Sequence, residues 1–220
     1  MVYCIGIPKN IPARTGRKEK NMKTQVKSQQ MVTTALLCAV IVILQVLSTF
    51  VAKFALLPIS ITLALAPILV GTALYGRRTG ALLGFVLAVV ILIMGITGGD
   101  GGTYVLLQAN PVATVCIALL KTTVAGYMAG LVYQAIAPRN MTLGVAVAGV
   151  VCPVVNTGLF VAGALLFLQD TLKEWAGGSP LWNYIIVGLT GINFLIELAV
   201  NLVLATVIVR IIRVYGRRKV

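Results

Sequence analysis

The sequence predicts an all-α integral membrane protein with six transmembrane helices and both termini in the cytoplasm. Of its 220 residues, 59% are hydrophobic and only 10% are charged, which is too apolar a composition for a soluble domain of this size. The apolar segments are continuous runs rather than short alternating ones, and this pattern favours helices over a strand barrel. Because about 20 apolar residues cross a hydrocarbon core of about 30 Å, the chain accommodates about six spans.

Gly, Pro and Arg residues between the apolar runs delimit the predicted helices. The expected spans are residues 31–51, 59–75, 80–96, 111–136, 143–168 and 182–209. We therefore expect a basic cytoplasmic N-terminal arm at 1–30, a six-helix membrane domain at 31–215 and a basic cytoplasmic tail at 216–220.

The orientation follows from the distribution of Lys and Arg between the two sides of this six-span arrangement. Fifteen of the 18 basic residues fall on one side, Lys53 and Lys173 fall on the other, and Lys121 lies inside a span. The basic side is expected to be cytoplasmic. The net charge of +13 would suggest a nucleic-acid partner in a soluble protein, but these charges flank the spans. They are expected to contact anionic lipid of the cell membrane, and no nucleic-acid partner is predicted.

The sixth predicted span carries polar residues on a single helical face, namely Asn183, Thr190, Asn193, Glu197 and Asn201. A carboxylate at mid-bilayer costs about 2.5 kcal/mol or more, so Glu197 is expected to face the bundle interior. Lys121 in the fourth span lies about 15 Å from the outer end and within reach of Glu197 if the two helices adjoin. The two side chains either form an ion pair that fixes helix packing or line a ligand cavity.

The fifth span contains Pro153, which removes one backbone hydrogen bond and leaves the Gly149 carbonyl without its usual donor. Asn156 follows three residues later. Such a break is best tolerated against protein or a wet cavity, although a simple kink also explains it.

The connection between the third and fourth spans has five glycines in eight residues, from Gly95 to Gly102. The pattern predicts a mobile outer loop, either an ordinary turn or a lid that closes over an external pocket, with Gly98–Gly102 as its moving part. Gly99, Asp100 and, after the loop, Asn110 are the candidate substrate contacts here.

Other chemistry finds little support. The chain has no histidine and four cysteines without a CxxC pair, so neither a metal site nor a cofactor is expected. No Gly-Lys-Ser/Thr motif follows the glycines, and the spans show no nucleophile with an evident base, which disfavours an enzyme.

Small residues recur at four-residue spacing in pairs that permit close helix contact: Ala35 and Ala39, Gly80 and Gly84, and Gly126 and Gly130.

These features together resemble the substrate-binding subunits, or S components, of energy-coupling factor (ECF) vitamin transporters, over nearly the whole chain from about Met31. The residues that carry the resemblance are 61–68, the turn 75–81 with Gly84 and Phe85, the Ala35 to Ala39 pair, 152–158, and the segment from Asn193 to Glu197. Their order along a six-helix chain is what identifies the family.

The resemblance implies a subunit that captures a small vitamin from outside and associates with a membrane coupling subunit and two cytoplasmic ATPases, which drive release inward. It assigns Ala35 and Ala39 to the partner-binding face. It assigns substrate capture to the outer loops and the outer halves of the later helices, where the candidate residues are Gly99, Asp100, Asn110, Lys121, Asn156, Asn193 and Glu197.

The vitamin stays open between the pantothenate, riboflavin and folate classes, although Lys121 suits a carboxylated vitamin such as pantothenate if Glu197 does not neutralise it. The alternative function is a self-sufficient secondary transporter in which Glu197 carries the coupling proton.

Overall fold

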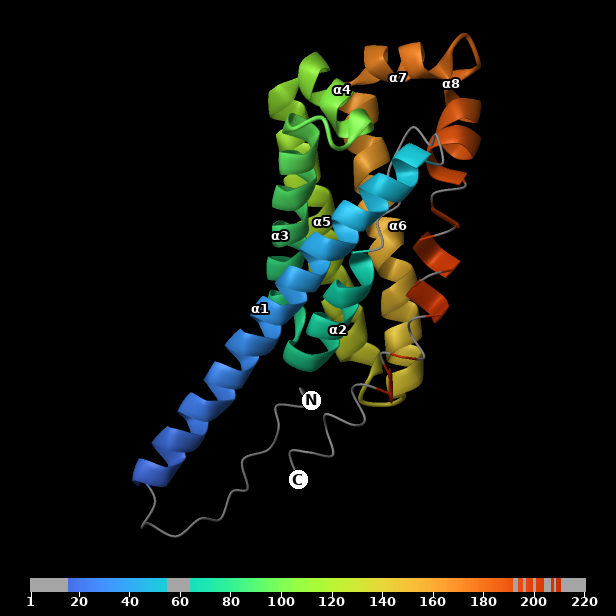
Figure 1. Cartoon of the computed structure of the whole chain (residues 1–220). Coiled ribbons are helices and arrows are strands. Elements are labelled where there is room, and N and C mark those ends of the chain that lie inside the picture. Colours follow the sequence, from blue (N-terminus) through green and yellow to red (C-terminus); the bar gives the residue numbers. More distant parts are fainter. Residues whose placement is uncertain are drawn as a thin grey trace.

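The computed structural model describes residues 16–54 and 64–191, and, in the last segment, 194–195, 197–199, 201–203, 207 and 209–210. Every regular element in these residues is helical, which confirms the predicted all-α class there. The elements, in chain order, are α1 (Gly16–Phe54), α2 (Leu65–Tyr75), α3 (Arg77–Ile96), α4 (Gly101–Ala109), α5 (Pro111–Ile136), α6 (Met141–Phe167), α7 (Gln169–Ala176), α8 (Leu181–Asn183) and the π-helix η1 (Tyr184–Gly191) (Figure 1).

Four helical stretches are long and apolar enough to cross a membrane: Ser28–Phe50 within α1, and the whole of α3, α5 and α6. The described part of the second predicted span, α2, has 11 residues and is about 17 Å long, which is short of the hydrocarbon thickness. The second and sixth predicted spans both extend into residues outside the described ranges. The count of six spans and the orientation of the termini therefore remain predictions.

The first helix starts earlier than the first apolar run. α1 begins at Gly16 and so includes half of the predicted polar arm, because this stretch is rich in Lys, Glu, Gln and Met, which favour helix. Residues 1–15 and the predicted tail at 216–220 lie outside the described residues.

The prediction of one mobile glycine loop after α3 is wrong for its second half. Only Thr97 to Asp100 form a turn, and α4 begins at Gly101. Asp100 stands at the N-cap position in an extended conformation, and its carboxylate accepts a hydrogen bond of 2.6 Å from the Thr103 hydroxyl. This start allows the following residues, which include the buried Leu106, to continue as a helix despite the two glycines.

α5 packs along both α3 and α6, and these are the most extensive helix contacts described. Glycine makes the α3 contact possible. A Cβ atom on Gly80 would lie 2.5 Å from the Gly126 carbonyl oxygen, and one on Gly130 would lie 2.5 Å from the Arg77 Cα. A Cβ on Gly84 would likewise collide with the Thr122 carbonyl oxygen. The glycine pairs therefore form the close helix contact that their spacing predicts.

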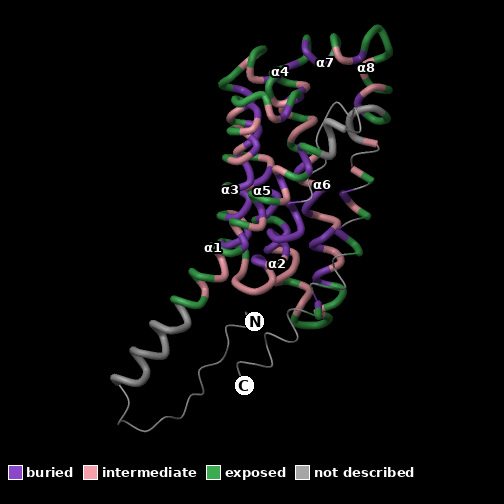
Figure 2. The backbone as a smooth tube through the Cα atoms, viewed as in Figure 1, coloured by how far each residue is buried: buried purple, intermediate pink, exposed green. Residues whose placement is uncertain are grey.

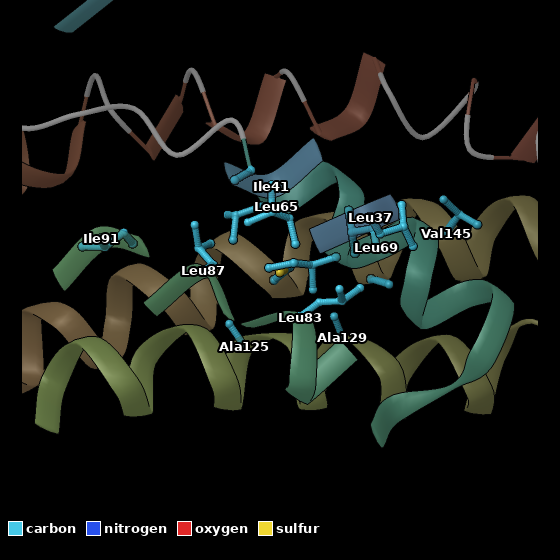
Figure 3. Packing of buried hydrophobic residues seen from close by; sticks show 14 of the residues in the cluster. Leu37, Ile41, Leu65, Leu69, Leu83, Leu87, Ile91, Ala125, Ala129 and Val145 are labelled. Carbon is cyan, nitrogen blue, oxygen red and sulfur yellow. The ribbon is translucent and has the colours of Figure 1, made fainter. Parts of the chain in front are cut away.

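The main core joins α1, α2, α3, α5 and α6 (Figure 3). Leu37 and Ile41 of α1 meet Leu65 of α2 and Leu83 and Leu87 of α3. Buried residues concentrate where these helices pack, while α4, α7 and α8 lie together at one end of the bundle (Figures 1 and 2). A second apolar cluster lies at that end and includes Leu106, Leu168 and Leu172.

The two ends of the bundle differ in charge. The turns that lead into α3 and α6 lie at the lower end of Figure 1 and carry Arg77, Arg78 and Arg139. The upper end carries Asp100 and the exposed ion pair of Lys173 with Asp170, whose charged atoms are 3.2 Å apart. This asymmetry agrees with the sidedness that the sequence predicts, with the α4 end outside.

Candidate ligand-binding site

A cavity lies beneath α4, between α3, α5 and α6. Its wall includes three residues with polar side chains, Thr103, Thr114 and Lys121. The rest of the wall is apolar and is formed by Ile91, Leu106, Ile117, Ala118, Phe160 and Leu168. An apolar enclosure with a few convergent polar groups is the usual form of a small-molecule site.

Lys121 gives the cavity its positive charge. The residue lies ten positions after the start of α5 at Pro111, which is about 15 Å along the helix. Its Nζ lies 4.7 Å from the centroid of the Phe160 ring on α6, within the range of a cation–π interaction. Lys121 thus meets the face of the Phe160 ring inside the bundle.

α4 covers the cavity and is attached to the helices below it by few polar contacts. The Thr114 hydroxyl on α5 lies 2.8 Å from the Leu106 carbonyl oxygen of α4 and 2.8 Å from that of Asn110. At the other end of α4, Thr103 packs so closely on Gly95 of α3 that a Cβ on that glycine would lie 2.6 Å from the Thr103 methyl carbon. One hydrogen bond of Thr114 and the apolar contacts of Thr103 and Leu106 therefore hold this cover in place.

The cavity is small, with a volume of about 20 Å³. This volume holds about one water molecule, whereas pockets for vitamin-sized ligands enclose about 300 Å³ or more. A ligand can enter only if the walls separate, and α4 is the wall with the fewest attachments.

The structure assigns different positions to the candidate residues of the outer turn. Gly99 is half-buried in the turn, and Asp100 is buried at the start of α4 with Thr103 as its hydrogen-bond donor. Asn110 caps α5, because its Oδ1 accepts a hydrogen bond of 3.1 Å from the Ala113 amide. That cap explains the presence of Asn110 without a ligand. Lys121 is the candidate that lies in the cavity wall.

The deeper candidates are buried. Asn156 on α6 is 4% exposed, and its Oδ1 has no hydrogen-bond partner among the described residues. Glu197 is 7% exposed and near enough to Cys152 of α6 to act on its thiol electrostatically. Asn193 lies outside the described residues. The inward direction predicted for Glu197 is confirmed, while its role as a ligand contact stays a prediction.

Sequence reasoning missed Phe160, Thr103 and Thr114, because nothing in a one-dimensional pattern pairs α6 or α4 with Lys121. It also missed Gln45 of α1, which is 1% exposed. A signal for this residue existed. Gln45, Ser48 and Thr49 form a short polar stripe inside an apolar helix, at the spacing that places them on one face.

Comparison with known proteins identifies the family of the chain. Residues 29–209 match the family model "ECF transporter, substrate-specific component". The chain belongs to this family. It is therefore a multi-pass membrane transport component rather than an enzyme, which confirms the resemblance found in the sequence.

One curated relative of this S component is the pantothenic acid transporter PanT of Lactococcus lactis subsp. cremoris. The two chains are 25% identical over 191 residues, which cover 83% of this chain and 93% of the relative. No solved structure matches the chain.

Proposed function

We propose that this S component captures pantothenate at the α4 end of the bundle and that Lys121 binds its carboxylate. The observation that carries the proposal is the position of Lys121 in the wall of a mostly apolar cavity. The relative named for pantothenic acid, which aligns with most of the chain, supports this choice over riboflavin and folate.

The chemistry of the cavity suits this vitamin. Pantothenate combines a carboxylate with a short chain that bears two methyl groups, hydroxyls and an amide. The Lys121 ammonium group can donate to the carboxylate, and apolar side chains such as Ile117 and Phe160 can contact the methyl groups. In the empty site the Phe160 ring faces the ammonium group, so a bound carboxylate would replace a weak cation–π contact with a stronger charge-assisted bond.

Substitution of Lys121 tests the proposal. A hydrogen bond to a charged group contributes about 1.5 to 3 kcal/mol, so Lys121→Met should weaken pantothenate binding by about 10-fold to 150-fold. Binding is measured by calorimetry on the purified protein in detergent, with riboflavin and folate as comparison ligands. Lys173→Met is the matched control, because Lys173 is exposed and pairs with Asp170. Unchanged pantothenate affinity in a folded Lys121→Met protein contradicts the assignment of the site, and absent binding by the unmodified protein contradicts the substrate.

We further propose that uptake requires a membrane coupling subunit and two cytoplasmic ATPases, as is general for this family. Ala35 and Ala39 are the proposed contact for the coupling subunit. Both are exposed on α1, next to the exposed side chains of Leu36 and Ile43, so a partner helix could approach closely along this face.

The alternative, a self-sufficient proton-coupled transporter that uses Glu197, makes an opposite prediction for uptake. Proteoliposomes that contain only this chain should accumulate pantothenate when a proton gradient is imposed. The ATP-driven proposal predicts no accumulation there, and uptake only after the coupling subunit, the ATPases and ATP are supplied.

A further inference from the structure

Gln45 is a buried polar side chain whose hydrogen bonds are unmade. It lies in the middle of an apolar stretch of α1 and is 1% exposed. Neither Nε2 nor Oε1 has a hydrogen-bond partner among the described residues. Burial of an amide in an apolar interior without partners is strongly unfavourable, so its presence calls for an explanation other than packing.

The other polar residues of this stripe differ from Gln45. The Ser48 hydroxyl donates to the Leu44 carbonyl oxygen at 2.7 Å, and the Thr49 hydroxyl donates to the Gln45 carbonyl oxygen at 2.9 Å. Both hydroxyls are thereby satisfied within their own helix. In this stripe, the Gln45 amide has no hydrogen-bond partner among the described residues, so its N–H groups and its oxygen remain available to another molecule.

Gln45 points into the bundle and not towards lipid or a partner subunit. Leu37 and Ile41, which precede it by two turns and one turn on the same helical face, are in the main core. α1 packs there against α2 and α3. Ile91 of α3 belongs both to this core and to the wall of the Lys121 cavity. The α1 face that carries Gln45 therefore packs on the same core as Ile91, and Ile91 is a residue of the cavity wall.

Gln45, Asn156 and Lys121 lie at similar distances from the ends of their own helices. Gln45 is nine residues from the end of α1, and Asn156 is eleven residues from the end of α6. Measured along their helices, these separations are about 14 and 17 Å, against about 15 Å for Lys121.

We propose that Gln45 is a ligand-binding residue whose amide hydrogen-bonds the hydroxyl or amide groups of the vitamin that Lys121 holds by its carboxylate. The inference rests on the proposed function and adds to it the recognition of the neutral polar part of the substrate. Separation of the walls at Ile91 would bring the Gln45 amide to the ligand. An amide that is unpaired in the empty protein and paired in the complex adds selectivity, because apolar carboxylates leave it unsatisfied.

The test measures thermal stability and pantothenate affinity in the full-length protein, in parallel for Gln45→Leu and Gln45→Met. Both substitutions remove the amide. Met keeps an unbranched side chain, and Leu keeps a similar side-chain volume. The ligand-free melting temperature should be equal or higher, because no unpaired amide remains, while the dissociation constant for pantothenate should rise about tenfold. Ser48→Ala, which removes a hydroxyl already satisfied within α1, should leave affinity unchanged.

The outcomes separate the two proposals. If the unmodified protein binds pantothenate and both Gln45 variants bind it equally well, the inference about Gln45 is wrong and the proposed function stands. If the variants lose ligand-free stability in proportion to their loss of affinity, Gln45 is a structural residue and the inference is again wrong. If the unmodified protein does not bind pantothenate, the proposed function fails and the inference fails with it.

Discussion

Removal of the Thr114 hydroxyl is expected to loosen the helix that covers the cavity. This hydroxyl, on α5, lies 2.8 Å from the Leu106 carbonyl oxygen of α4 and can donate a hydrogen bond to it. In Thr114→Val, the Leu106 carbonyl still accepts from the Asn110 amide at 3.0 Å, so no buried acceptor is left unpaired. The single hydroxyl proton of Thr114 is shared between the Leu106 and Asn110 carbonyl oxygens, each 2.8 Å away. The change therefore removes at most one hydrogen bond, up to about 1 kcal/mol, from the closed arrangement.

A loss of about 1 kcal/mol corresponds to an increase of about fivefold in the equilibrium constant for opening α4. Hydrogen exchange of the α4 amides should accelerate by about this factor in ligand-free protein, and pantothenate should associate faster by up to the same factor. Thr122→Val is the matched control. Thr122 is also buried on α5, but its hydroxyl donates to the Ala118 carbonyl oxygen of its own helix.

The reasoning fails if α4 exchanges at the same rate in Thr114→Val and Thr122→Val. It fails equally if exchange accelerates over the whole bundle rather than in α4, because that result would indicate a general loss of stability. Faster hydrogen exchange in α4 with no change in the association rate of pantothenate would show that the ligand enters by a different route.

Two further predictions concern the outer turn and the partner face. Gly98 has a φ of +71°, so Gly98→Ala should destabilise the turn by about 1 kcal/mol. Gly101 begins α4, and a Cβ atom there would meet open space, so Gly101→Ala should be neutral or stabilising. Thermal melts of the two variants measure this difference. Replacement of both Ala35 and Ala39 by Leu should abolish co-purification with the coupling subunit and uptake, yet leave pantothenate affinity in detergent unchanged. Equal melting temperatures for the two glycine variants, or intact uptake by the double Leu variant, would contradict these expectations.

Much of the fold was predictable because local signals mark the helix ends. Asn110 followed by Pro111 is a strong helix start, and α5 spans the residues that the sequence predicts. α4 was not predictable from composition, because glycine suggests a flexible loop, whereas the structure forms a helix from Gly101 onward. The local signal was present in Asp100, but the burial of Leu106 that stabilises α4 depends on tertiary contacts.

The site was predictable only in part, for a related reason. A charge inside a span must face the interior, and this rule alone identifies Lys121. It does not say which side chain the lysine meets, because the partner Phe160 is an ordinary apolar residue on another helix. The same limit applies to Gln45, because the lack of hydrogen-bond partners for its amide among the described residues is visible only once its surroundings are known.

The position of the positive charge also bears on the direction of capture. In the part of the chain that the structure describes, Arg77, Arg78 and Arg139 lie at the end opposite to α4, whereas Lys121 lies in the half nearer to α4. A carboxylate that enters beneath α4 meets Lys121 first and is separated from the arginine-rich end by the closely packed glycine contact of α3 and α5. Passage through that contact would require the two helix backbones to separate. We therefore propose that this S component binds its ligand from the α4 end, while release at the opposite end requires a rearrangement of the bundle, for which ATP-driven partners are the proposed source of energy.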